Sequence, residues 1–372
     1  MKLFVRINLM LILLFCTILT SAQAELQLEN IGDFTSSKES IIALSNVQNN
    51  MSENPDSCNI ISIPSRGDWS ASEEVIGLQL GPPGSWDDFN PGAITPCTIV
   101  KLSGTYYLYY IGSDGKRDHD DGPAHRKLGL ATSSNGIDFT KYEGNPILSW
   151  SPMNNDEEGI FGAKALSIDG KIHLYLNTIS AKNASTDQVW ADVHLLTSTD
   201  GKHFSKPVLV LDHSNAAIIG YGDELGPSGI MYNDGKWTLY YFAKGIGMSS
   251  WGLCLATGDS PVSFGSTKPM IDEKLFFGTG GDVHCLSNSK IAMFFQKRSD
   301  WSRIEVYTAL ADNPDKLTKV KTWDGFVQEG GVTVFLDKRA GKWFMYNRRL
   351  SDGSKMYVRI APVKYEVFYH SL

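Results

Sequence analysis

The chain has 372 residues, of which 42% are hydrophobic and 20% are charged, and its net charge at pH 7 is -7. This acidic balance argues against nucleic acid or an anionic membrane surface as a partner. The five cysteines include no CxxC pair, so we expect no cysteine-based zinc site.

Residues 1–24 are predicted to form a cleaved signal peptide. A basic start precedes an apolar run from Leu9 to Leu19, and a small-x-small pattern ends at Ala24. The run is too short to span a bilayer, and no later stretch reaches about 18 apolar residues. We therefore expect a secreted or periplasmic protein that is not inserted in the membrane after cleavage.

Residues 25–57 are polar and poor in aromatic side chains, which predicts a flexible leader with one short helix around residues 37–47. A single ordered domain is expected over residues 58–372. Four cysteines follow the cleavage site, and their spacing allows disulfides as well as free buried thiols.

From residue 96 onward, a pattern of strand, tight turn and aromatic strand occurs five times. The aromatic strand is clearest in Thr105–Tyr110 and Lys236–Tyr241. Asp-Gly at two of the turns favours a two-residue hairpin, because both central positions need a positive φ. The five turns lie at residues 103–104, 169–170, 234–235, 288–289 and 340–341.

A third strand closes each unit, and no helical pattern competes with the strands. Five near-copies spaced by about 50 to 65 residues are typical of a propeller. The sequence thus predicts an all-β fold, a five-bladed β-propeller of antiparallel four-stranded blades. Ring closure is expected to pair the last blade with a strand near residues 60–64.

The loops that lead into the first strand of each unit all contain a carboxylate. Fivefold pseudosymmetry would bring these loops together at one mouth of the central channel. Glycosidic cleavage needs one protonated and one ionised carboxyl group, and crowding in a partly desolvated site separates their pKa values. The loops are residues 86–91, 155–159, 222–227, 280–284 and 327–331.

These repeats, above all residues 128–136 and 234–241, resemble the five-bladed propeller glycoside hydrolases of families 32, 43, 68, 117 and 130. The resemblance implies an enzyme that cleaves an oligosaccharide or a polysaccharide. It also implies an Asp base or nucleophile before the first inner strand, a helper acid before the second and a Glu acid before the third. The matching candidates are Asp88 (or Asp87), then Asp156 or Glu158, then Glu224.

Two positions depart from the pattern of these families. Counting back from the first hairpin turn, the usual acid position falls at Thr95-Pro96, and the helper position of the second unit falls at Lys164. Both departures favour the alternative of a carbohydrate-binding propeller without catalysis. A scaffold for protein partners is a third reading, which the acidic, Trp-rich loops support little.

Cations recur near strand ends, and Arg298 and Arg348 occupy corresponding places in the fourth and fifth units. Because an Arg fork suits a carboxylate or sulfate group, an acidic or sulfated saccharide is one hypothesis, and salt bridges at the rim are the other. The residues assigned to substrate binding are Trp86, Asp87, Lys164, Asp223, His284, Arg298 and Arg348.

No cofactor is required by this interpretation, and no catalytic metal is assigned. The resemblance allows a structural Ca²⁺ near His284, because some family 43 members place a channel histidine near calcium. Asp118, Asp120 and Asp121 supply hard oxygen ligands of the type that Ca²⁺ prefers. A hydrogen-bonded core histidine and a solvated acidic loop are the respective alternatives.

Overall fold

The computed structural model describes residues 60–89, 94–116, 125–149, 159–179, 191–213, 224–244, 252–271, 281–297, 300–325, 329–349 and 353–366. The predicted signal peptide, the leader and its short helix lie outside these residues. None of the helical turns in the described part of the chain has the length and apolar character that a membrane span needs.

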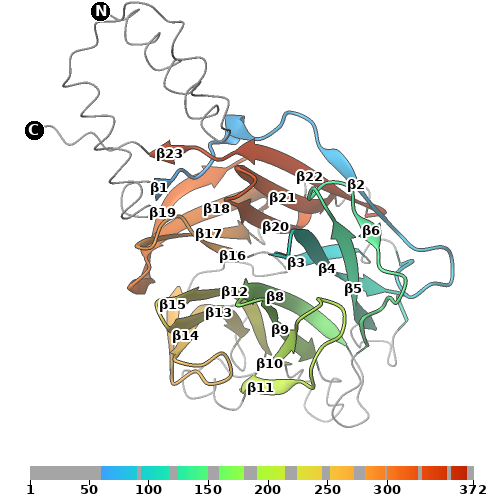
Figure 1. The fold of residues 1–372 in the computed structure, drawn as a ribbon, viewed down its shortest axis with the longest axis horizontal. Helices are drawn as coiled ribbons and strands as arrows, with labels where there is room; N and C mark the ends of the chain where they lie inside the picture. The colour runs from blue at the N-terminus through green and yellow to red at the C-terminus, as the bar shows by residue number, and fades with distance from the viewer. Residues whose placement is uncertain are drawn as a thin grey trace, which may run out of the picture. The chain divides into compact units, whose positions relative to one another are not determined.

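The described chain forms five antiparallel blades arranged as a propeller ring, which confirms the predicted fold class (Figure 1). Blade 1 consists of β3 (Thr95–Leu102), β4 (Thr105–Ser113) and β5 (Arg126–Ser133), with β6 (Thr140–Lys141) and β7 (Leu148–Ser149) paired to β5. Blade 2 consists of β8 (Ile160–Ile168), β9 (Lys171–Ile179), β10 (Ala191–Ser198) and β11 (Val208–Leu211).

The remaining three blades each have four strands. Blade 3 consists of β12 (Glu224–Asn233), β13 (Lys236–Lys244), β14 (Gly252–Gly258) and β15 (Ser266–Ile271). Blade 4 consists of β16 (Asp282–Cys285), β17 (Lys290–Lys297), β18 (Asp300–Leu310) and β19 (Asn313–Trp323). Blade 5 consists of β20 (Glu329–Asp337), β21 (Lys342–Arg349), β22 (Lys355–Pro362) and β2 (Glu74–Gln79).

The first hairpin turn of blades 1, 2 and 3 has the backbone that the sequence predicts. Ser103, Asp169 and Asp234 have φ values of 49°, 50° and 46°, and the glycine after each also has a positive φ. Two successive positive φ values match the right-handed twist of the flanking strands, so the turn fixes the register of each hairpin.

Five apolar clusters hold the ring together, and each lies between two neighbouring blades. The aromatic second strands supply both sides of these clusters, because alternate side chains point to opposite faces of a strand. In β21, for example, Trp343 packs between blades 4 and 5, whereas Phe344 packs between blades 5 and 1. The aromatic residues of the second strands therefore form much of each cluster between neighbouring blades, and these five clusters are called the seams below.

The ring is closed by the N-terminal part of the domain. Strand β2 pairs antiparallel with β22 as the outermost strand of blade 5, and Figure 1 shows the two side by side. The segment near residues 60–64, predicted to close the ring, instead forms β1 (Ile60–Ile61), which pairs with β23 (Tyr365–Glu366) outside blade 5. Closure by the chain ends is thus confirmed, but the strand that completes the blade comes later in the sequence.

The described cysteines are free thiols. Cys97 and Cys254 are buried, and Cys285 is partly buried. Burial raises the pKa of the Cys97 thiol to about 12, so this side chain is protonated at neutral pH. Cys58, the fourth cysteine after the predicted cleavage site, lies outside the described residues.

A buried polar contact joins blade 5 to blade 1 across the closure. The Tyr106 hydroxyl donates to Asp337 Oδ2 at 2.5 Å, and Lys101 Nζ lies 2.7 Å from the same oxygen. Burial acts to raise the pKa of Asp337, but the hydrogen bonds from Lys101 and Tyr106 outweigh it and lower that pKa. The carboxylate is therefore ionised in the folded ring.

Replacing Asp337 by Asn should lower the free energy of unfolding at pH 7 by about 1–3 kcal/mol, because two charge-assisted contacts are lost. The folded pKa of Asp337 lies below its unfolded value, so its contribution is present above about pH 4 and is lost as the pH falls through the folded pKa. Urea unfolding of wild type and D337N over a pH series measures this. A stability difference that does not shrink in acid would contradict the assignment.

Candidate functional site

The innermost strands of the five blades, β3, β8, β12, β16 and β20, contact one another in order around the ring. Because every blade has the same antiparallel hairpin order, the first residues of these strands lie at the same end of the ring. Three of the strands begin with a carboxylate, namely Glu224, Asp282 and Glu329. In the described residues, three of the predicted carboxylate-bearing segments thus continue into inner strands, and their part in a site stays a prediction.

A buried ion pair lies among the inner strands. Lys164 Nζ of β8 lies 2.8 Å from Asp282 Oδ1 of β16, and the exposed fractions of the two residues are 3% and 7%. Lys164 also donates to the carbonyl oxygen of Cys97 in β3 at 2.9 Å. The second oxygen of Asp282 accepts the backbone N–H of Val334 in β20 at 2.7 Å.

The groups around this pair are linked to one another as well. Thr333 Oγ1 donates to the Cys97 carbonyl at 3.1 Å, and the backbone N–H of Ala165 donates to Thr98 Oγ1 at 3.0 Å. The prediction that Lys164 binds substrate stays a prediction, but the structure already gives its ammonium group two partners.

His284 is a hydrogen-bonded core histidine in the structure, which was the alternative weighed against a metal ligand. Its Nε2 lies 2.8 Å from the Val334 carbonyl, and its ring packs against Phe294, Phe335 and Trp343. Burial lowers the pKa of His284, so the ring is neutral and Nε2 carries the donated proton.

The residues at the axis do not fit a calcium ion there. Asp282 is already neutralised by Lys164, and His284 uses Nε2 as a donor to a carbonyl oxygen. An ion at this place would face the Lys164 ammonium group at close range, and like charges repel strongly in a buried setting. The other predicted calcium ligands, Asp118, Asp120 and Asp121, lie outside the described residues.

Trp86 and Asp87 pack into blade 1. The Trp86 ring stacks on Tyr110 with centroids 5.8 Å apart, in a space that a Cβ on Gly112 or Gly129 would fill. Asp87 is 3% exposed and forms an ion pair of 2.6 Å with Lys141. The part of these two residues in substrate binding stays a prediction, and both already have structural contacts.

The two principal catalytic candidates differ in how far the structure describes them. Asp88 is partly exposed, and its Oδ2 accepts the backbone N–H of Gly84 at 2.5 Å. Glu224 is the first residue of β12, where its backbone pairs with Ala191 of β10 and with Lys244 of β13. Asp156, Glu158, Asp223 and Arg298 lie outside the described residues, so the catalytic assignment as a set stays a prediction.

Arg348 has a buried guanidinium without a hydrogen-bond partner at Nε or Nη1 in the described part of the chain. It pairs with Gly330 near the start of β20, at the end of the ring where the inner strands begin. Arg348 shares the face of β21 with Phe344 and Tyr346, which pack between blades 5 and 1. Burial lowers the pKa of this side chain from its ordinary value.

Comparison with known proteins gave matches by structure only. No family model and no curated protein matches the sequence. A family 43 β-xylosidase/α-arabinofuranosidase from a compost microbial metagenome, solved with xylotriose in a calcium-free form, has a TM-score of 0.55 at 15% identity, covering 80% of this chain and 98% of that one. The chain has the five-bladed fold of such glycosidases.

Two further solved structures extend the likeness. An endo-arabinase from Bacteroides thetaiotaomicron gives a TM-score of 0.53 at 13% identity, covering 81% of this chain and 99% of that one. A β-1,2-mannobiose phosphorylase from Listeria innocua gives 0.51 at 14% identity, covering 83% and 95%. At such identities the likeness concerns the fold and carries no residue roles.

Two ion pairs of this propeller join residues between which the sequence shows no relation. Asp282 was part of a recognised carboxylate loop, but nothing in the sequence paired it with Lys164, which is far away in the chain. Lys141, the partner of Asp87, lies beyond the third strand of blade 1 and carried no signal. The glycines at 112 and 129, inside otherwise bulky strands, were the one available sign of a close-packed neighbour.

Replacing Lys164 by Met should lower the free energy of unfolding by about 3–5 kcal/mol, because Asp282 is left charged and buried. The double variant K164M/D282L should lose less than the sum of the two single variants, since no lone buried charge remains. Urea unfolding of all four proteins measures the coupling. An unfolding midpoint of K164M equal to that of wild type would show that the pair is not formed.

Proposed function

We propose that this protein is an exported glycoside hydrolase that cleaves an oligosaccharide or polysaccharide carrying acidic or sulfated groups. The observation that carries the proposal is the likeness of nearly the whole propeller to solved glycosidases, together with carboxylates at the starts of the inner strands. The pattern of residues 1–24 supports export to the periplasm or the outside medium.

The catalytic roles in this proposal follow the order of the loops around the ring. Asp88 acts as base or nucleophile, Glu224 as general acid, and Asp156 or Glu158 adjusts the pKa of Glu224. The separation of the two principal carboxyl groups decides the stereochemistry, about 5 Å for retention and about 6.5 to 9.5 Å for inversion.

Arg348 supports the acidic or sulfated part of the proposal. Two buried guanidinium nitrogens without hydrogen-bond partners cost free energy, because their N–H groups have left water without a replacement acceptor among the described residues. Carboxylate or sulfate groups of a bound saccharide would supply acceptors for these N–H groups and form charge-assisted hydrogen bonds with them. The position near the start of β20 places Arg348 at the end of the ring that bears the carboxylates.

A carbohydrate-binding propeller without catalysis is the second candidate. It is favoured because two acidic side chains already have local partners. Asp87 forms an ion pair with Lys141, and Asp88 accepts a hydrogen bond from the backbone N–H of Gly84. Lys164, at the helper position of the second unit, is likewise engaged with Asp282. In such a protein the same residues would bind a saccharide without cleaving it.

Product release from a panel of neutral and anionic oligosaccharides tests the main proposal. We expect turnover by wild type, and Asp88→Asn and Glu224→Gln should each lower kcat by about 10² to 10⁴, because each removes a proton-transfer or nucleophilic group. Asp259→Asn is the matched control, since Asp259 forms an exposed pair with Lys236. Saccharide binding without turnover, unchanged in both variants, would favour the binding protein.

Replacing Arg348 by Ala should weaken binding of anionic oligosaccharides by about tenfold or more, since charge-assisted hydrogen bonds are lost, while neutral ones bind as before. Titration calorimetry with a matched pair of uronate-bearing and neutral oligosaccharides measures the difference. Arg303→Ala serves as the control, because Arg303 forms an exposed ion pair with Asp324. An equal loss for both ligands would remove the anionic assignment and leave the glycosidase proposal standing.

A further inference from the structure

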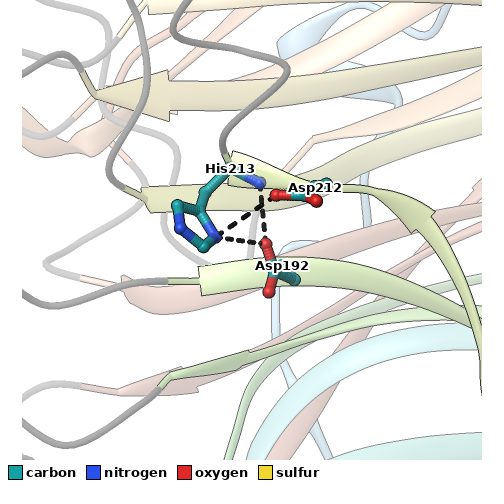
Figure 2. Close-up of side chains that lie close together, drawn as sticks. All are labelled: Asp192, Asp212 and His213. Atoms are coloured by element: carbon teal, nitrogen blue, oxygen red, sulfur yellow. Dashed lines mark hydrogen bonds and ion pairs between the residues drawn. The ribbon is translucent and has the colours of Figure 1, made fainter.

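Three ligand-type side chains meet where β10 begins and β11 ends (Figure 2). Asp192 is the second residue of β10, and Asp212 and His213 directly follow β11. The ladder between the two strands pairs Val193 with Leu211, so one further step places Asp192 opposite Asp212. The local register thus brings two carboxylates to the same face of blade 2.

The distances within this group are short. His213 Nδ1 lies 2.8 Å from Asp192 Oδ1 and 3.6 Å from Asp212 Oδ1, and one donor atom from each residue lies within 4.8 Å of the others. The backbone N–H of His213 also donates to Asp192 Oδ1 at 2.7 Å, which fixes the orientation of that carboxylate. Figure 2 shows the imidazole and both carboxylates turned toward one another.

The group combines two carboxylates and one imidazole, which is a donor set that can bind a metal ion. Carboxylates directly opposite each other on neighbouring strands repel, and these side chains are only 28% and 34% exposed. His213 places its Nδ1 beside both carboxylates, so a metal ion bound there would contact all three side chains. The mixed imidazole and carboxylate donor set distinguishes this group from an ordinary acidic patch.

We propose that Asp192, Asp212 and His213 form a binding site for a divalent transition-metal ion, with Zn²⁺ as the best-fitting cation. Two ligand atoms on one Zn²⁺ stand about 3 to 3.5 Å apart when each bond is about 2 Å long. The Nδ1–Oδ1 separations of 2.8 and 3.6 Å lie on either side of this range, so small side-chain movements would suffice to bind the ion. Ca²⁺ and Mg²⁺ prefer oxygen ligands alone, whereas an imidazole nitrogen suits zinc and its neighbours in the periodic table.

A metal ion bound at this site would stabilise the junction between blades 2 and 3. Ala191, next to Asp192, pairs with Glu224 at the point where blades 2 and 3 form one continuous sheet. A metal bound by Asp192, Asp212 and His213 fastens the end of β11 to the start of β10 beside this junction. The site is separate from the proposed catalysis, because none of its three residues is assigned to the reaction.

Calorimetric titration of the untagged full chain with ZnCl₂, after removal of metal with a chelator, tests the proposal. We expect one zinc ion to bind per chain, and Zn²⁺ should raise the melting temperature while CaCl₂ and MgCl₂ leave it unchanged. His213→Gln and Asp212→Asn should each weaken zinc binding by about tenfold or more, because each removes one of three protein ligands.

His203→Gln is the matched control, since His203 Nδ1 contacts the single carboxylate of Asp200 at 2.7 Å on an exposed turn. This variant should bind zinc as wild type does. Zinc binding that survives unchanged in both H213Q and D212N would place the ion elsewhere and overturn the proposal. Absence of zinc binding by the folded wild type would also overturn it and leave only the hydrogen bonds between His213 and Asp192.

Discussion

The buried pair of Lys164 and Asp282 is the contact on which the centre of this propeller depends. Its hydrogen bonds reach Cys97 of blade 1 and Val334 of blade 5, so four of the five blades are linked through two side chains. A buried ion pair is stabilising only when further hydrogen bonds offset its desolvation, and here the Cys97 carbonyl accepts from Lys164 and the Val334 N–H donates to Asp282. The positions of the inner strands are therefore set by directed polar contacts as well as by apolar packing.

The seams between blades complement this polar centre. Each seam is lined by alternate residues of the aromatic second strands, and burial of that surface provides the main favourable term for closing the ring. Near the starts of the inner strands the character changes, because Arg348 is buried there with two guanidinium nitrogens that lack a partner in the described structure. The buried charges of Lys164 and Asp282 are thus paired with each other, whereas the Arg348 guanidinium has no such pairing at Nε or Nη1 among the described residues.

The fold could be read from the sequence because each blade repeats the same local signals. Turns such as Asp169-Gly170 and Asp234-Gly235 adopt the backbone that their residue types favour, and alternate residues of the strand beginning at Lys236 pack against blades 2 and 4. The contacts of the candidate site residues could be predicted less well from the sequence. Lys164 was expected to face substrate, but its partner Asp282 lies two blades away, and only the closed ring brings the two together. The closing strand β2 was also missed, since its pairing with β22 depends on where the ring ends meet.

The pairing of β2 with β22 has a consequence for the order in which the domain can assemble. These strands come from opposite ends of the domain, so β2 has no strand to pair with until β22 has been synthesised. Contacts that span so much sequence slow folding, because a long loop must close before they form. Blades 1 to 4 can form from consecutive residues, whereas the last seam waits for both ends.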